Sequence, residues 1–189
     1  LATVSFPSAP LSGIMSFDAT GTGTFDSPRY DVKIGIADLF VGDEGIGQVT
    51  GRLALRGEMM TLDAEASSNR LSVSGSGRIA LTPEMDTEAT LRFSDTSLDP
   101  YLRFVAPKMS PFTTAVADGT IRVVGELADL HHLRVETSVD KLQLKLFDYP
   151  AANEGPIQLA LNQGVVQVTR FRLVGEGTAL ELSGTVGLD

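Results

Sequence analysis

The feature that most constrains this chain is a strict alternation of apolar and polar residues. Near its end, apolar residues or glycine occupy every second position, at Leu180, Leu182, Gly184, Val186 and Leu188. A similar stretch, NRLSVSGSGRIAL, lies about a hundred residues earlier, at 69–81. Because successive side chains of a β-strand point to opposite faces, both stretches are predicted to be strands with one apolar face.

The same alternation recurs along most of the chain. Apolar residues stand at every second position around 32–36, 53–55, 62–66, 85–93, 121–123, 135–139, 142–146 and 157–161. Short turn segments such as GDEG at 42–45 and NQG at 162–164 separate these runs. Connections this short suit antiparallel hairpins, because parallel strands need a dozen or more connecting residues. The predicted fold is all-β, an elongated antiparallel meander of about a dozen to fourteen strands.

One segment departs from the strand pattern, SLDPYLRFVAPKMSP at 97–111. Asp99 is a favourable N-cap, Pro100 suits the first helical position, and Pro107 disfavours helix at the residue before it. A short helix is therefore predicted near 99–106, and a proline-containing linker completes the segment 99–111. This segment divides the predicted meander into a first β array at 1–98 and a second at 112–189, both parts of one continuous fragment.

Two sequence details refine the predicted meander. The segments VTGRLALRGEMMTL at 49–62 and GPIQLALNQGVVQV at 155–168 share LAL, a turn with glycine and an apolar pair. Duplication and convergent strand chemistry both explain this likeness. The apolar positions then change parity after Val168, to Phe171 and Leu173, which predicts a β-bulge near Thr169 and Arg170.

Composition narrows the function classes. The net charge of -9, with 15 scattered Lys and Arg residues, argues against nucleic-acid binding. The chain has no cysteine, which excludes disulfides and thiolate chemistry. No apolar run reaches the roughly 18 residues that a membrane-spanning helix needs. The chain begins at Leu1 without a signal-peptide pattern and stops directly after a predicted strand, so we interpret it as an internal piece of a longer polypeptide.

The residues capable of chemistry are few. His131 and His132 are adjacent, and neighbouring strand residues point to opposite faces, so we do not expect them to bind one metal ion together. Glu84, Asp86 and Glu88 share a predicted face, but a calcium site needs six to eight oxygen ligands, usually from a loop. We interpret these carboxylates as a solvated face. The chain is expected to be non-enzymatic, with no catalytic residue, metal or cofactor.

The glycine-rich stretches at 21–25, 42–51 and 74–78 match neither a phosphate-binding loop nor a dinucleotide fingerprint. Glycine within strands more often marks a bulge or bend that lets a sheet curl. A carbohydrate-active enzyme that uses Glu84 or Asp86 is a minor alternative, because no tryptophan is present to stack on a sugar.

An apolar sheet face must be covered. Alternation alone is compatible with a sandwich, a barrel or a sheet curled around a guest. The residues predicted to line a groove for such a guest are Val32, Ile34, Leu71, Val73, Leu91, Phe93, Ile121, Val123, Leu142, Leu144, Leu146, Ile157, Leu159, Leu161, Leu180 and Leu182.

Several segments resemble a known family. The most similar motifs are GTIRVVGEL at 119–127 and LVGEGTALELSGTV at 173–186. The similarity extends over most of residues 20–189. They are similar to the TamB and AsmA-like proteins of the translocation and assembly module. These motifs are short β repeats, and the family has no catalytic signature to compare.

The resemblance implies a periplasmic segment of an inner-membrane-anchored protein of a diderm bacterium. It implies a taco-like hydrophobic groove that carries phospholipid between the inner and outer membranes, assists outer-membrane protein assembly, or does both. The implied partners are phospholipid or unfolded outer-membrane protein strands, and an Omp85-type outer-membrane barrel reached through another part of the chain. The alternative is a structural β-solenoid or sandwich module of a surface or secreted protein, with a closed core.

Overall fold

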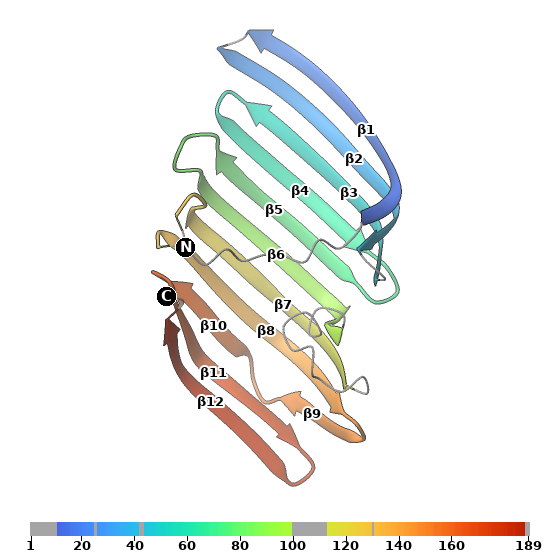
Figure 1. Cartoon of the computed structure of the whole chain (residues 1–189), viewed down its shortest axis with the longest axis vertical. Helices are drawn as coiled ribbons and strands as arrows, with labels where there is room; N and C mark the ends of the chain where they lie inside the picture. Colours follow the sequence, from blue (N-terminus) through green and yellow to red (C-terminus); the bar gives the residue numbers. More distant parts are fainter. Residues whose placement is uncertain (1–10, 25, 42–43, 100–112, 130, 188–189) are drawn as a thin grey trace.

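The chain forms one twelve-stranded antiparallel sheet in a computed structural model that describes residues 11–24, 26–41, 44–99, 113–129 and 131–187 (Figure 1). The strands are β1 (Leu11–Thr24), β2 (Ser27–Val41), β3 (Glu44–Arg56), β4 (Met59–Ser67), β5 (Ser72–Ala80), β6 (Asp86–Ser97), β7 (Thr113–Glu126), β8 (Leu133–Leu146), β9 (Tyr149–Asn153), β10 (Ile157–Asn162), β11 (Val165–Gly175) and β12 (Thr178–Gly187). The predicted all-β antiparallel meander is confirmed.

The strand order follows the sequence with one exception. Each strand pairs with its predecessor except β10, which pairs directly with β8. β9 lies off the main path and pairs with β8 and β11. β6 and β7 also pair along most of their length, so the segments on either side of 99–111 belong to one sheet.

The hairpin turns follow from local sequence. In the β10–β11 hairpin, Gln163 and Gly164 both have positive φ (51° and 71°), as a two-residue type I′ turn requires. In the β3–β4 hairpin only the first turn residue, Gly57, has positive φ (60°), the pattern of a type II′ turn. The two similar segments noted in the sequence therefore both form hairpins, with different turns.

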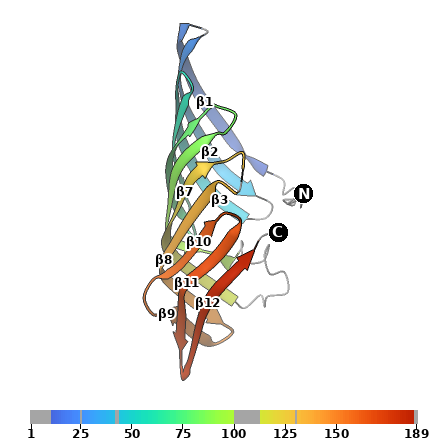
Figure 2. The same ribbon diagram turned by 90° about the vertical axis from the view of Figure 1, so that its left-hand side faces the viewer.

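The sheet is twisted and bent, so that it presents a concave and a convex face (Figure 2). Register shifts interrupt several of its ladders, and one of them lies between Val168 and Phe171 of β11. This shift confirms the bulge predicted near Thr169 and Arg170. Bulges increase local twist and bend the strand that carries them, so they contribute to the curvature.

The predicted helix near 99–106 and the linker after it lie outside the described residues, apart from Asp99. The Asp99 carboxylate accepts a hydrogen bond from the Ala115 N–H (2.5 Å) and one from Arg70 (3.1 Å). Asp99 thereby ties the end of β6 to the first residues of β7 and to the turn before β5.

The sheet does not enclose a conventional core within the described ranges. The buried apolar residues are Leu71, Ala115, Ala117, Leu133, Ile157 and Leu173. No large side chain there is fully buried, and Phe17 and Leu182 are 70% and 49% exposed. Substantial contacts between described strands occur only between hydrogen-bonded neighbours, so no described strand packs across the apolar face.

Candidate functional site: an uninterrupted apolar face

Cross-strand register assembles the apolar side chains into continuous rows. Partners in an antiparallel ladder share a face, so the pairings can be followed from β1 to β12. One such row is apolar or glycine at every position: Ala19, Val32, Leu53, Leu62, Gly77, Ala89, Val123, Val135, Leu161, Val166 and Val186. With about 4.8 Å between strands, the row extends roughly 50 Å.

The neighbouring row on the same face, two residues further along each strand, is also almost entirely apolar or glycine. It contains Phe17, Ile34, Gly51, Ala64, Gly75, Leu91, Ile121, Thr137, Leu159, Val168 and Gly184. Thr137 is its only polar member, and no charged residue occurs in either row. We call the face that bears these rows the apolar face.

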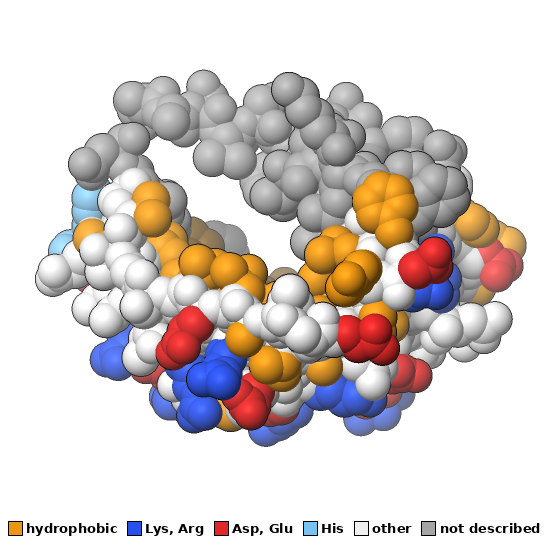
Figure 3. Space-filling model, turned by 90° about the horizontal axis from the view of Figure 1, so that it is seen from below, with side chains coloured by type: hydrophobic (Ala, Val, Ile, Leu, Met, Phe, Trp, Pro, Cys, Tyr) orange, Lys and Arg blue, Asp and Glu red, His pale blue; other side chains and the backbone are white. Residues whose placement is uncertain are grey.

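The opposite face has the opposite chemistry. The row between the two just described reads Asp18, Lys33, Arg52, Asp63, Ser76, Thr90, Arg122, Glu136, Ala160, Gln167 and Thr185. Seen from below the molecule, hydrophobic side chains line the hollow of the sheet, while Lys, Arg, Asp and Glu cover its outside (Figure 3). The apolar face is therefore the concave one.

A pocket of about 270 Å³ lies on the apolar face, across β3 to β7. Small residues create it, because Ala64, Gly75 and Gly77 leave the middle of the sheet without bulk. Larger apolar side chains, including Leu62, Leu91 and Ile121, line it as well. An apolar concavity of this kind is suited to hydrocarbon.

Most of the predicted groove residues lie on the apolar face. Val73, Leu91, Ile121 and Val123 line the pocket together. Val32, Ile34, Phe93, Leu142, Leu144, Leu146, Ile157, Leu159, Leu161, Leu180 and Leu182 lie on the same face by register. Leu71 precedes β5 and is buried, 9% exposed.

Several residues that line the pocket were not among those predicted from the sequence to line the groove. Val49, Leu62, Ala64, Ala66, Ile79 and Ala89 line it but were not predicted as groove residues. Their alternation with polar neighbours was visible in the sequence. Their juxtaposition with β6 and β7 depends on the register of the sheet.

A second bulge, at Asp140 in β8, was also missed. Val139 pairs with Gly119 and Lys141 with Asp118, so Asp140 has no partner on β7. The Asn153 side chain satisfies this irregular backbone: it accepts from the Leu142 N–H (2.6 Å) and donates to the Asp140 carbonyl (3.0 Å). The change of apolar parity between Val139 and Leu142 is the signal that could have revealed it.

The carboxylates considered for calcium do not form a site. Met85 has positive φ (56°), so β6 begins at Asp86 and Glu84 lies in the preceding turn. The prediction that Glu84, Asp86 and Glu88 share a strand face is therefore wrong. Glu88 instead forms ion pairs with Arg78 (2.8 Å) and Arg122 (3.1 Å). No group of three metal-ligating side chains occurs in the part of the chain that the structure describes.

The two arginines also determine the protonation of Glu88. The hydrogen bond from Arg122, together with the charge and hydrogen bond of Arg78, lowers the pKa of the Glu88 carboxyl below its ordinary value. Glu88 thus stays ionised on the solvated outside of the sheet, where it links β5, β6 and β7.

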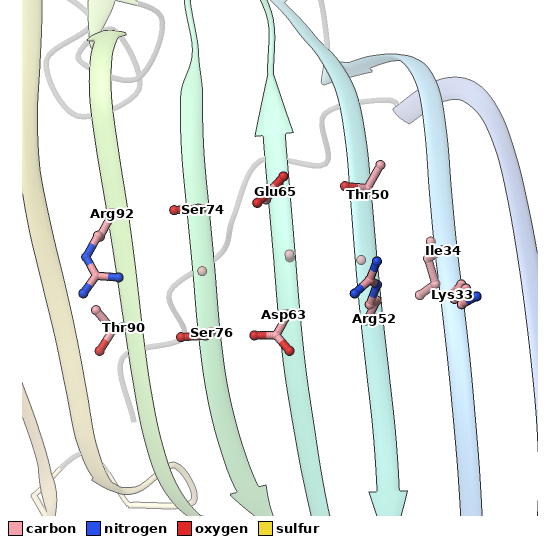
Figure 4. Close-up of a pocket in the computed structure, with 13 residues that line it drawn as sticks. Lys33, Ile34, Thr50, Arg52, Asp63, Glu65, Ser74, Ser76, Thr90 and Arg92 are labelled. Atoms are coloured by element: carbon pink, nitrogen blue, oxygen red, sulfur yellow. The ribbon is translucent and has the colours of Figure 1, made fainter.

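A depression of about 580 Å³ lies on the charged face, across β2 to β6 (Figure 4). Lys33, Arg52 and Arg92 line it together with Asp63 and Glu65. The floor consists largely of hydroxyl-bearing side chains from β3, β5 and β6. Its mixed charges and open hydroxyls are typical of a solvated surface.

His131 and His132 lie in the turn before β8, not on a strand as predicted. Asp129 forms this turn: its side chain accepts from the His131 N–H (2.9 Å) and its carbonyl from the His132 N–H (3.0 Å). The His132 ring lies 2.9 Å from Glu126 and 3.7 Å from Asp129.

The Glu126 carboxylate raises the pKa of His132, first through a hydrogen bond and then through charge, and Asp129 adds to the effect. A raised pKa means that this interaction stabilises the fold at pH values below the ordinary histidine pKa, and that the stabilisation is lost as pH rises through the folded-state pKa. We expect the Glu126→Gln substitution to lower the NMR titration midpoint of His132. An unchanged midpoint would contradict the pairing.

No family model, curated protein or solved structure matches this chain. Among the described residues, no helix has both the length and the hydrophobicity to span a bilayer.

Proposed function

We propose that this sheet is a non-enzymatic segment of a TamB-like periplasmic protein that carries phospholipid acyl chains between the inner and outer membranes. The observation that carries the proposal is the pair of neighbouring uncharged rows that cross the sheet from β1 to β12. The sequence resemblance at 119–127 and 173–186 supports the assignment to this family and the periplasmic location.

Physical chemistry favours such a guest. Each methylene removed from water contributes about 0.8 kcal/mol, so a sixteen-carbon acyl chain gains on the order of 10 kcal/mol before ordering costs. A buried unpaired charge would cost several kcal/mol, so a lipid path needs rows without charges. The polar headgroup can remain in water at the open side of the concave sheet.

The alternative, a structural module with a closed core, has less support. Such a core needs a second apolar layer on the apolar face, and no described strand provides one. Assistance to outer-membrane protein assembly remains part of the proposal, because an unfolded strand with alternating apolar side chains is also compatible with this face.

A photoreactive amino acid can test the proposal directly. Placed at Leu62, in the pocket of the apolar face, it should crosslink phospholipid when the protein is expressed in a diderm bacterium. At Asp63, the adjacent residue on the charged face, it should not. Protein crosslinks at position 62 without lipid would identify a client strand as the guest. The absence of any crosslink at position 62, with no lipid in native mass spectra, would contradict the proposal in favour of a structural module.

A further inference from the structure

The bulges of several strands lie on one line across the sheet. An extra residue interrupts β2 at Asp38, β6 at Asp95, β8 at Asp140 and β11 at Thr169. The first three follow, within two residues, members of one ladder row, which reads Ile36, Val49, Ala66, Val73, Phe93, Gly119, Val139 and Ile157. The fourth lies opposite the start of β10, where this row reaches β10. We call this line the crease.

The strands between the bulges are also adapted to the crease. β9 and β10 lie end to end between β8 and β11, so the link between them, 154–156, falls at the level of Asp140 (Figure 1). Glycine stands beside the bulges on three neighbouring strands, at Gly47 in β3, Gly119 in β7 and Gly184 in β12. An unpaired bulge residue can change its backbone angles without breaking a ladder bond, and glycine can do so without a side-chain clash. The sheet is therefore most easily bent along the crease.

One side of the hollow lies beyond the crease. It consists of residues 113–117 of β7, 141–146 of β8, 149–153 of β9, 171–175 of β11 and 178–182 of β12, which pair with one another in this order. We call this part of the sheet the wall. Leu142, Leu144 and Leu173 of the wall face the concave side. The angle at the crease therefore sets the width of the hollow.

Polar links, rather than a packed core, fix the angle at the crease. The Asp118 carboxylate accepts a hydrogen bond from the Asp95 N–H. The Asn153 amide bridges the Asp140 carbonyl and the Leu142 N–H. No described strand packs across the wall, because substantial contacts between described strands occur only between hydrogen-bonded neighbours. A region with few packed contacts and exposed hydrogen bonds rearranges at a low cost in free energy.

We propose that the crease is a hinge, about which the wall swings to widen and narrow the hollow of the sheet. Such hinge motions are collective and occur within microseconds to milliseconds. The proposal concerns the motion of the sheet itself, so it holds whatever guest the apolar face carries.

Spin labels can test the hinge, because the chain has no native cysteine to interfere. Thr61, Gln143 and Gln167 are exposed positions on the outer face, and only Gln143 belongs to the wall. In frozen, lipid-free protein, the Thr61→Cys/Gln143→Cys pair should give a distance distribution about twice as broad as that of the Thr61→Cys/Gln167→Cys pair, because only the first pair spans the hinge. Equal widths for the two pairs would overturn the proposal. Because no lipid is added, that result would leave the proposed function intact.

A substitution at the crease provides a second measurement. Asn153→Ala removes the amide that bridges Asp140 and Leu142, so it should broaden the distribution of the 61–143 pair further and leave the 61–167 pair unchanged. Asn162→Ala, at the other end of β10, is the matched control and should alter neither pair. Circular dichroism should show both variants folded. Equal broadening of the two pairs by Asn153→Ala would indicate general loosening of the sheet and would also overturn the hinge.

Discussion

Replacing Leu91 with arginine is expected to reduce bound phospholipid by about tenfold or more. Leu91 lies near the middle of one uncharged row and lines the pocket of the apolar face. A guanidinium there must lose its water when an acyl chain covers it, and an unpaired buried charge costs several kcal/mol, more than the roughly 1.4 kcal/mol that a tenfold loss requires. Quantifying the lipid that copurifies with the protein measures the effect.

The matched control is Thr90→Arg, which adds the same charge to the same strand on the charged face. Its lipid content should equal that of the wild-type protein. Circular dichroism should show both variants folded. The Leu91 side chain is already 38% exposed, so an arginine side chain fits at this position without steric overlap. Equal lipid loss in the two variants, or no loss in either, would contradict the proposed role of the apolar face.

The Gly119→Ala substitution is expected to cost on the order of 3 kcal/mol of unfolding free energy, as steric overlap in a packed region does. A Cβ atom at Gly119 would lie 2.4 Å from the Ser138 carbonyl oxygen of β8 and 2.6 Å from the Phe93 ring of β6. The carbonyl belongs to the neighbouring backbone and cannot rotate away. Urea unfolding, followed by circular dichroism, measures the change.

Gly57→Asn provides the comparison. A Cβ atom at Gly57 meets nothing within 4 Å, and asparagine tolerates the positive φ of 60° at this turn. The positive φ still strains a non-glycine residue, so its unfolding free energy should fall by about 1 kcal/mol, well below the loss expected for Gly119→Ala. A small effect at Gly119 as well would mean that β7 and β8 can separate locally to admit a methyl group.

Local sequence pattern predicted the parts of this fold that depend on strand periodicity. Alternation assigned Leu142, Leu144 and Leu146 to one face, and a parity change located the bulge beside Thr169 and Arg170. The turn containing His131 was missed, because it depends on the Asp129 side chain and carbonyl rather than on a repeating pattern.

The curvature and the pocket could not be predicted in the same way. The pocket exists because Ala64 and Gly75 are neighbours across β4 and β5, and Gly75 in turn faces Leu91. These residues come from three strands, and only the register brings them together. The ion pairs of Glu88 similarly require β6 to pair with both β5 and β7. Alternation predicts which face a residue occupies, but not its neighbours on that face.

The bulge at Asp140 shifts the alternation of inward-facing and outward-facing side chains in β8 by one residue. Before it the odd-numbered residues Val135, Thr137 and Val139 point to the concave side, and after it the even-numbered leucines do so. If Asp140 instead paired as a regular strand residue, the three leucines would turn outward into water and the lysines inward, with no change to any side chain. The bulge at this position therefore determines which residues face inward as firmly as composition does. The amide of Asn153, through its hydrogen bonds to the Asp140 carbonyl and the Leu142 N–H, holds the extra residue in place.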